Sequence, residues 1–298
     1  MLKQSRRSIS MKWDRAGLQK HSDAQNDQAI YRRNELEKQF QLPKRLETII
    51  ERMPTSGCIA DIGCDHAYVA IEAVRRGKAA RALACDVRKG PLQQAAEHIL
   101  CAGLAGKIET RLSDGLEKVA PGEADCVIIA GMGGPLMERI LQGRLADFGH
   151  FVLSPQSEIP HFRRFLLAEG MLIDEETMLI DEGKYYVILN VSRRAGTREA
   201  SKDAVRHIVP GKMNAADAGA EAKTGTGTVH SEAAPADPMY VTEEDFLYGG
   251  RLLHRLDPVL KSFLEKEKTR YEGILRQTDS DEVRTAYQHC MNALEAYR

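Results

Sequence analysis

The chain has 298 residues, of which 43% are hydrophobic and 29% are charged, and its formal net charge at pH 7 is −1. This length allows one large hydrophobic core plus a smaller unit, and the composition is that of an ordinary globular protein. The nearly neutral charge excludes a uniformly basic nucleic-acid binder, so any affinity for nucleic acid has to come from local patches.

Other features predict a cytoplasmic protein without a membrane segment or a metal. No apolar run approaches the roughly 20 residues of a membrane helix, and the basic start at residues 1–7 is not followed by the apolar segment of a secretory signal. The six cysteines form no C-x-x-C pair and have no ligand spacing with the histidines. Cys58, Cys85 and Cys126 lie in apolar segments, where buried free thiols in a reducing compartment are expected.

The patterning divides the chain into four segments. Residues 1–40 are polar and weakly patterned, which predicts a mobile arm. Residues 41–194 alternate between strand and helix patterns. Residues 195–238 are rich in Ala, Gly, Thr, Lys and Glu without apolar periodicity, which predicts a disordered insert or linker. Residues 239–298 are helical in pattern.

The second segment predicts an α/β fold. A helical face at 42–53 precedes apolar strands at 58–63, 81–87, 107–112, 124–130 and 151–153, with helices at 67–76, 92–102, about 135–141 and 158–169. Two last strands, at 171–180 and 185–191, are joined by the tight connection 181–184, which is typical of an antiparallel hairpin. This order predicts a doubly wound, mostly parallel Rossmann-like sheet, with its ligand loops at the strand carboxyl ends.

The last segment predicts two helices. Leu253, Leu256, Leu260 and Phe263 recur at three- and four-residue steps, and a similar repeat runs from Val283 to Tyr297. With a turn at 277–281, such stripes predict an antiparallel coiled-coil hairpin.

The most informative stretch is C-I-A-D-I-G-C-D-H-A-Y at residues 58–68. A buried strand ends there in Asp61 and Gly63 and then breaks into a loop that carries Asp65. Glycine permits close approach of the backbone to a ligand. Asp86 ends the next strand, where a carboxylate accepts both hydroxyls of a ribose. The stretch therefore predicts a site for a nucleoside cofactor.

The loop chemistry distinguishes between cofactors. A nicotinamide dinucleotide requires G-x-G-x-x-G around its pyrophosphate, whereas here only Gly63 is present and Asp65 would repel a phosphate. S-adenosylmethionine has no phosphate and carries a sulfonium cation, so it tolerates an acidic loop. It also takes an acid for ribose (Asp86) and an acid-containing turn for adenine (113–115). The residues therefore favour S-adenosylmethionine.

These motifs resemble the bacterial tRNA (adenine-N1)-methyltransferases that modify adenine 22 in the D-arm. The resemblance covers residues 42–191, and more loosely the helical end, but not residues 1–40 or 195–238. Cys64, Ser113 and the turn 154–156 depart from the family pattern. The resemblance rests on A-D-I-G-x-D-H-A-Y (60–68), G-P (90–91), D-G-L (114–116), A-G-M-G-G (130–134) and D-E-G-K (181–184).

The resemblance implies a class I S-adenosylmethionine-dependent methyltransferase and a set of cofactor contacts. Arg45 would pair with the methionine carboxylate, Asp86 would hold the ribose, and Asp114 would accept from the adenine amino group. The implied cofactor residues are Arg45, Asp61, Gly63, Asp86, Val87, Ser113, Asp114, Gly115, Ala130, Gly131 and Met132.

The resemblance also implies catalytic and substrate residues. Adenine N1 has an in-plane lone pair, so the site needs alignment and stabilisation of developing positive charge rather than a base. Asp65 would perform this task. His66 is either a second catalytic contact or a structural hydrogen-bonder, and Tyr68 either stacks on a base or packs in the core. Gly133 and Gln156 complete the implied base pocket, although Gln156 is equally placed to cap the next helix.

The partner implied is tRNA, not DNA. Because N1 is hidden in a Watson–Crick pair, the base must be unpaired or flipped at a cost of a few kcal/mol. Arg255, Lys261 and Lys268 in the last segment are candidate tRNA contacts, or else a solvated, salt-bridged helix face. Three alternatives stay open. The first is a methyltransferase that acts on another RNA, a small molecule or a protein and uses its own helical tail to dimerise. The second is a non-catalytic cofactor-binding adaptor, and the third is a dehydrogenase, which the missing glycines disfavour.

Overall fold

The computed structural model describes residues 42–193 and 237–298. The predicted arm at 1–40 and nearly all of the predicted insert at 195–238 lie outside the described residues. Asp237, which the sequence assigns to the end of that insert, is buried and pairs with Arg251. In the described part of the chain, no helix combines the length and the apolar character needed to cross a bilayer.

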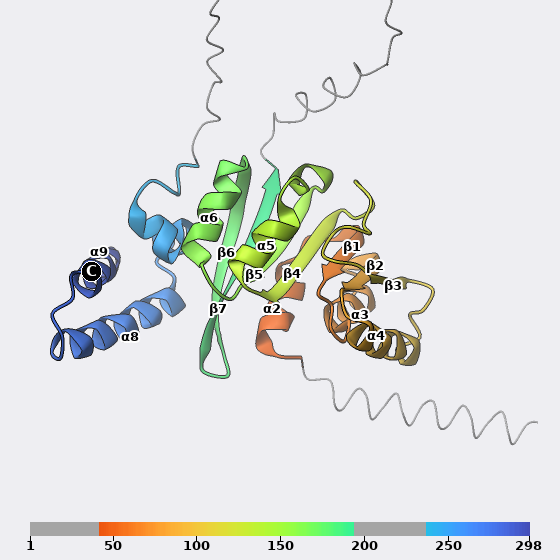
Figure 1. Ribbon diagram of the computed structural model, residues 1–298, viewed down its shortest axis with the longest axis horizontal. Helices are drawn as coiled ribbons and strands as arrows, with labels where there is room; N and C mark the ends of the chain where they lie inside the picture. The colour runs from red at the N-terminus through yellow and green to blue at the C-terminus, as the bar shows by residue number, and fades with distance from the viewer. Residues whose placement is uncertain (1–41, 194–236) are drawn as a thin grey trace, which may run out of the picture.

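A seven-stranded sheet organises the fold, with the strand order β3-β2-β1-β4-β5-β7-β6 (Figure 1). Pairing is parallel from β3 to β5, whereas β7 is antiparallel to both β5 and β6. The predicted mostly parallel Rossmann-like sheet with a closing hairpin is therefore confirmed. The strands are β1 (Ser56–Ile62), β2 (Ala79–Asp86), β3 (Ile108–Leu112), β4 (Cys126–Met132), β5 (His150–Pro155), β6 (Met171–Asp181) and β7 (Lys184–Arg193).

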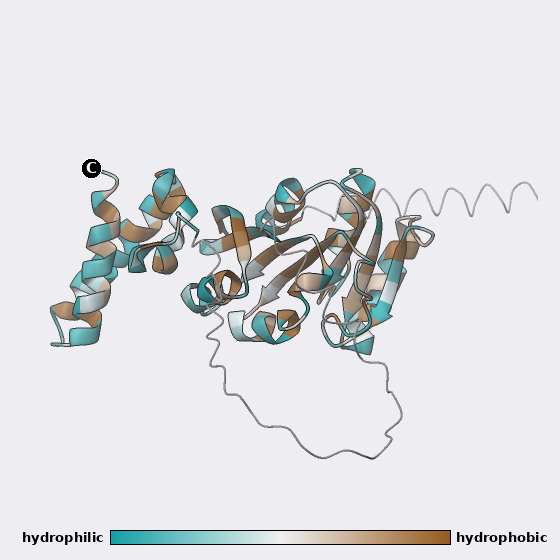
Figure 2. Cartoon of the chain, turned by 90° about the horizontal axis from the view of Figure 1, so that it is seen from above, coloured by the Kyte–Doolittle hydropathy of each residue, from teal (hydrophilic) through white to brown (hydrophobic). Residues whose placement is uncertain are grey.

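Helices cover both faces of the sheet, and each face has its own apolar cluster. Within β4, Val127 and Ile129 belong to one cluster, while Cys126 and Ile128 belong to the other. This is why the strand is apolar throughout rather than alternating, and Figure 2 shows the hydrophobic strands between helices with hydrophilic outer faces. One face carries α2 (Lys44–Arg52), α3 (Tyr68–Arg75) and α4 (Lys89–Cys101); the other carries α5 (Gly134–Leu141) and α6 (Ile159–Ala168).

The end of β4 differs from its prediction. The strand reaches Met132 instead of ending at residue 130, and its register against β5 shifts between Ala130 and Met132. Gly131 between them has φ +79°, a left-handed conformation that glycine adopts without strain. The glycine-rich segment therefore stays paired with β5 as far as Met132, across an irregularity in the strand register.

The tail (residues 237–298) is interrupted where the sequence predicted a continuous apolar repeat. Leu256 has φ +56° and is 49% exposed, so it does not belong to a helical stripe. Asp257 caps the following helix by accepting from the amides of Val259 and Leu260, and Pro258 occupies its first turn, as such caps favour. The tail contains η2 (Asp245–Gly249), α7 (Gly250–His254), α8 (Pro258–Leu275) and α9 (Asp281–Glu295).

Helices α8 and α9 form an antiparallel pair. The thiol of Cys290 lies 3.3 Å from the carbonyl oxygen of Leu264, and the hydroxyl of Tyr287 donates to Glu272. The predicted helical hairpin is thus present, while its coiled-coil geometry stays a prediction.

The tail packs on α6 and β6 (Figure 1). Leu252, Leu260 and Leu264 share one apolar cluster with Phe162 and Leu166 of α6. At the same junction, the buried side chain of Arg163 pairs with Glu176 at 2.8 Å and donates to the carbonyls of Phe246 and Leu247. The tail and the sheet domain therefore share a core.

Candidate functional site

A pocket of about 510 Å³ lies at the carboxyl ends of β1, β2, β3 and β4. Its volume is in the range of small-molecule sites. All the predicted cofactor residues line it, together with Asp65, His66, Tyr68 and Gln156. The structure thus brings together side chains and backbone from segments that lie far apart in the sequence.

The loop between β1 and α3 is held against the neighbouring strands. The amides of Gly63 and Cys64 both donate to the carbonyl of Cys85 at the end of β2. Gly63, Asp65 and Ala67 all have positive φ, of +73°, +48° and +59°. Such conformations are uncommon for residues other than glycine, so this loop stores backbone strain where it borders the pocket.

Asp61 is a buried carboxyl group at the floor of the pocket. It is 5% exposed, and its Oδ2 has no hydrogen-bond partner among the described residues. Burial raises the pKa of the Asp61 carboxyl to about 7, against a hydrogen bond from the Ala70 amide, and the nearby Asp86 adds to the rise. A buried acceptor left unpaired in a pocket fits a cationic donor such as the ammonium group of S-adenosylmethionine.

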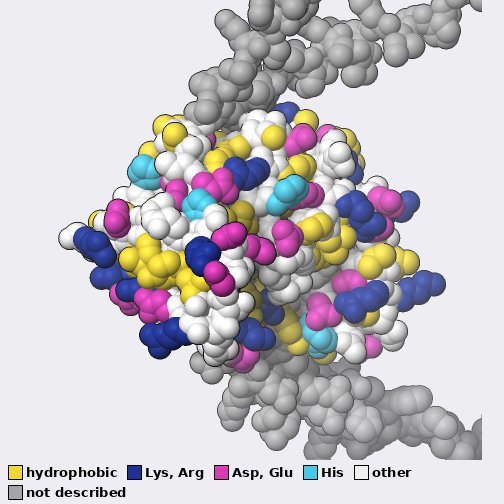
Figure 3. Space-filling view, turned by 60° about the vertical axis from the view of Figure 1, so that its left-hand side comes forward, with side chains coloured by type: hydrophobic (Ala, Val, Ile, Leu, Met, Phe, Trp, Pro, Cys, Tyr) yellow, Lys and Arg dark blue, Asp and Glu magenta, His cyan; other side chains and the backbone are white. Residues whose placement is uncertain are grey.

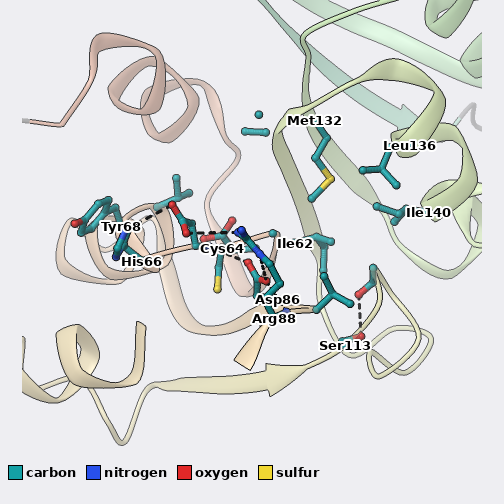
Figure 4. Close-up of a pocket in the computed structure, with 18 of the residues that line it drawn as sticks. Ile62, Cys64, His66, Tyr68, Asp86, Arg88, Ser113, Met132, Leu136 and Ile140 are labelled. Carbon is teal, nitrogen blue, oxygen red and sulfur yellow. Dashed lines mark hydrogen bonds and ion pairs between the residues drawn. The ribbon is translucent and has the colours of Figure 1, made fainter. Parts of the chain in front are cut away.

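Asp86 is buried at the end of β2 and its orientation is fixed by the backbone. Oδ1 accepts from the amide of Arg88 at 2.8 Å, and Oδ2 lies 3.4 Å from the amide of Asp65. Because a carboxylate accepts at about four sites, both oxygens keep capacity for the hydroxyls of a ribose. Val87, Leu136 and Ile140 add apolar surface suited to a flat ring to the pocket lining; Leu136 and Ile140, on α5, are labelled in Figure 4.

The turn after β3 holds Asp114 at the pocket. The Ser113 hydroxyl donates to the carbonyl of Gly115 and accepts from the amide of Lys118. Ser113 therefore shapes the turn, and Asp114, which pairs with Arg139 at 3.2 Å, presents its carboxylate to the pocket.

Arg45 enters the pocket from α2. Its amide donates to Asp181 of the β6–β7 hairpin at 3.2 Å, and its guanidinium lies 5.7 Å from the centre of the Tyr186 ring. Within residues 42–193 and 237–298 the guanidinium has no carboxylate partner, so it is available to bind the carboxylate of a ligand.

Asp65 and two aromatic rings form the mouth of the pocket. The Asp65 side chain is 59% exposed, with His66 Nε2 at 3.6 Å. The rings of His66 and Tyr68 stack at 5.2 Å (Figure 4), and each lies 5.4 Å from the ring of His98 on α4. Tyr68 therefore lies at the pocket rather than in the core interior.

Some predicted site residues lie elsewhere. Gly133 packs against Ser157, beside the pocket rather than in its wall. In the tail, Arg255 pairs with Asp257 at 2.8 Å, Lys268 lies 3.9 Å from Glu272, and neither they nor Lys261 lines the pocket. Figure 3 shows basic and acidic side chains interspersed on the face that it presents.

Several lining residues were not predicted. Arg88 directly follows the predicted residues Asp86 and Val87. Its place at the pocket is visible only from the contacts of its side chain with Asp65 and Asp86. On α5, Arg139 and Ile140 lie three and four residues after Leu136 and therefore on the same side of the helix. This spacing is visible in the sequence and could have indicated a stripe that faces the pocket. The remaining unpredicted lining residues are Pro43, Leu46, Ile62, Cys64 and Val69.

Comparisons with known proteins identify the family of the chain. Residues 42–189 match the family model of a methyltransferase domain. The chain is 37% identical over 170 residues to the tRNA (adenine(22)-N(1))-methyltransferase of Bacillus subtilis, covering 56% of this chain and 71% of that protein.

Solved structures of related methyltransferases have the same fold as this chain. The Streptococcus pneumoniae protein Sp1610, in complex with S-adenosyl-L-methionine, superposes with a TM-score of 0.65 at 27% identity over 85% of this chain and 100% of that one. The Bacillus subtilis methyltransferase TrmK gives a TM-score of 0.59 at 27% identity, covering 86% and 97% of the two chains. The extent and identity of these matches show that the chain belongs to the family of the tRNA (adenine(22)-N(1))-methyltransferases.

Proposed function

We propose that this protein transfers a methyl group from S-adenosyl-L-methionine to N1 of adenine 22 in tRNA, in the cytoplasm. The relative in Bacillus subtilis bears the name of this activity, and the Streptococcus pneumoniae relative holds the cofactor. The observation that carries the proposal is the placement of two differently exposed acids at one pocket. Asp86 is buried and oriented by backbone amides, while Asp65 is exposed at the mouth.

The residues present fit the cofactor. Asp86 would hold the ribose hydroxyls, Asp61 the ammonium group, and Arg45 the carboxylate. Val87 and Asp114 would contact the faces and the amino group of the adenine. The cofactor would supply an electrophilic methyl group on a sulfonium centre, which requires no phosphate contact and tolerates this acidic surrounding.

Asp65 would act on the target base. Its exposed carboxylate would accept a hydrogen bond from the exocyclic amino group next to N1. Because N1 gains a positive charge as it is methylated, the adjacent carboxylate stabilises the transition state more than the ground state. No base is required, since the lone pair of N1 is already free once the base is unpaired.

The neighbouring side chains would position the base. His66 and Tyr68 present stacked rings beside Asp65, a surface on which an unstacked base can lie. Gln156 also lines the pocket and would contact an edge of the base. Arg255, Lys261 and Lys268 of the tail would contact the tRNA backbone, and of these three Lys261 alone forms no ion pair with another described residue.

Mass spectrometry of tRNA tests the proposal. Unmodified tRNA transcript is incubated with the enzyme and methyl-labelled cofactor, digested, and analysed for 1-methyladenosine and its position. We expect one labelled methyl group at adenine 22, and none in a matched transcript with guanine at that position. Failure to label the first transcript, or equal labelling of both, would disprove the assignment.

A further inference from the structure

Arg88 connects the two acids that the proposed mechanism keeps separate. Its Nε lies 3.5 Å from Oδ1 of Asp86, and its Nη2 lies 3.8 Å from Oδ1 of Asp65 (Figure 4). One guanidinium therefore lies between the carboxylate expected to hold the ribose and the carboxylate expected to meet the target base.

These side-chain contacts are easily exchanged. The side chain of Arg88 is 66% exposed and that of Asp65 is 59% exposed, so water screens the pair and little is lost when it separates. The firm contact with Asp86 is made by the backbone amide of Arg88, at 2.8 Å. Displacing the guanidinium would therefore leave the orientation of Asp86 intact.

The guanidinium also lies where a ribose has to bind. A hydroxyl that donates to Oδ1 of Asp86 approaches the oxygen already contacted by Nε of Arg88. Once displaced, the guanidinium remains at the mouth of the pocket, because its backbone is held there. An RNA whose base enters the pocket must bring its own phosphates to this mouth, and arginine binds phosphate through two parallel hydrogen bonds.

We propose that Arg88 exchanges partners during the reaction cycle. Before the cofactor binds, Arg88 bridges Asp65 and Asp86; with cofactor and RNA bound, it holds a phosphate beside the target nucleotide and leaves Asp65 free to contact the base. This inference rests on the proposed function. It makes Arg88 a residue that positions the RNA.

Arg139 is the other exposed arginine at the pocket and does not fit this role as well. Its partner is Asp114, in the turn expected to contact the cofactor's adenine, and its side chain is 65% exposed. In the described part of the chain, Arg139 forms no hydrogen bond or ion pair with Asp65. Arg88 alone of the two touches the residue that must be released for the target base.

The test compares Arg88→Ala, Arg88→Lys and Lys89→Ala in the full-length protein. Lys89 is the matched control, because it is the next residue, is exposed and does not line the pocket. Binding of S-adenosylhomocysteine is measured by calorimetry without RNA. Binding of unmodified tRNA is measured by fluorescence anisotropy at several salt concentrations with saturating S-adenosylhomocysteine.

For Arg88→Ala we expect S-adenosylhomocysteine to bind as in the wild type or up to about five-fold more tightly, since a weak competitor for Asp86 is gone. We expect tRNA to bind roughly ten-fold more weakly, and the slope of log affinity against log salt to become shallower by about 1. Arg88→Lys should keep most of the salt dependence, and Lys89→Ala should match the wild type in both measurements.

Three results would overturn the inference. These are an unchanged salt slope in Arg88→Ala, a loss of S-adenosylhomocysteine affinity beyond ten-fold, which would make Arg88 a support for the cofactor, and an equal effect of Lys89→Ala. Each presupposes a wild-type protein that binds and methylates tRNA. If the wild type does neither, the proposed function itself has failed.

Discussion

Gly63 in the β1–α3 loop faces Met132 at the end of β4 so closely that a Cβ on Gly63 would overlap with the terminal methyl group of Met132. Gly63 also has φ +73°. The pairing of β1 with β4 in the sheet brings the two residues together. The floor of the pocket is therefore set by backbone from one strand end and a side chain from the next.

Replacing Gly63 with alanine should impair cofactor binding. Either the loop must move away or Met132 must turn into the pocket, and both change the space available to the methionine part of the cofactor. We expect the affinity for S-adenosylhomocysteine, measured by calorimetry, to fall at least roughly ten-fold.

Gly77→Ala is the matched control for this substitution. Gly77 has φ +68°, and a Cβ there would meet nothing within 4 Å. It should lose about 1–2 kcal/mol of unfolding free energy from backbone strain and keep the wild-type affinity. Equal affinities of the two variants would show that the contact with Met132 has no part in binding.

The stability of the protein should depend on pH through Asp61. Burial raises the pKa of this carboxyl from 3.8 to about 7. Between these values the folded protein binds more protons than the unfolded chain, so the free energy of unfolding falls as the pH rises from about 4 to about 7. Asp61→Asn should remove this dependence and, above pH 7, should be more stable than the wild type by on the order of a few kcal/mol. Chemical denaturation across pH measures both, and parallel pH profiles would contradict the assignment.

Binding of the cofactor should release a proton from the same group. At pH 6 the Asp61 carboxyl is mostly protonated, because its pKa is about 7, whereas an ammonium group bound beside it favours the ionised form. Calorimetry of S-adenosylhomocysteine in buffers of different ionisation enthalpy should show release approaching one proton at pH 6 and little at pH 8. Asp61→Asn should show none at either pH.

Asp65→Asn should separate binding from methyl transfer. The substitution keeps the shape of the side chain and leaves the backbone contact with Asp86 intact, but it removes the charge that we propose stabilises the transition state. We expect kcat to fall about 10²- to 10³-fold, while the affinity for S-adenosylhomocysteine stays within two- or three-fold of wild type. Single-turnover kinetics at saturating cofactor and tRNA would measure the step, and an unchanged rate would remove Asp65 from the mechanism.

The junction between the tail and the sheet domain should depend on the buried pair Arg163 and Glu176. Their side chains are 1% and 0% exposed. Arg163→Met leaves a buried, unpaired carboxylate and should cost about 3–5 kcal/mol of unfolding free energy. The double variant Arg163→Met, Glu176→Met should be clearly more stable than Arg163→Met alone. Denaturation of the wild type, of the single variants Arg163→Met and Glu176→Met, and of the double variant gives the coupling energy, and additive effects would argue against the pair as the anchor of the tail.

Sequence patterns were sufficient to predict the sheet and most of the residues that line the pocket. Strands β1, β2 and β3, which carry Asp61 and Asp86 near their carboxyl ends or are followed by Asp114, were recognised from local apolar runs followed by acid or glycine. Parallel strands place their carboxyl ends on one edge, so locating the ends in the sequence also located the site in space. The register shift at Gly131 was missed, because a bulge depends on pairing with a neighbouring strand rather than on the local run.

The tail was predicted less well, for a related reason. Periodicity treated Leu256 as part of a continuous stripe, although Asp257 and Pro258 carried the signature of a new helix start. The apolar residues continue at three- and four-residue steps across the interruption at Leu256, so their spacing did not reveal it. The packing of Leu252, Leu260 and Leu264 against α6 had no local signal at all, because it joins segments separated by the predicted insert.

The apolar runs of the chain predicted the fold class and the approximate position of each strand, because these depend on residues that are adjacent in the sequence. Acids at or just after the ends of three successive strands also predicted where a ligand would bind. The position of β7 between β5 and β6, the Asp61 oxygen without a partner among the described residues, and the contacts of Arg88 with Asp65 and Asp86 became visible only in three dimensions. These features depend on burial and on contacts between distant segments, which are settled when the whole core forms.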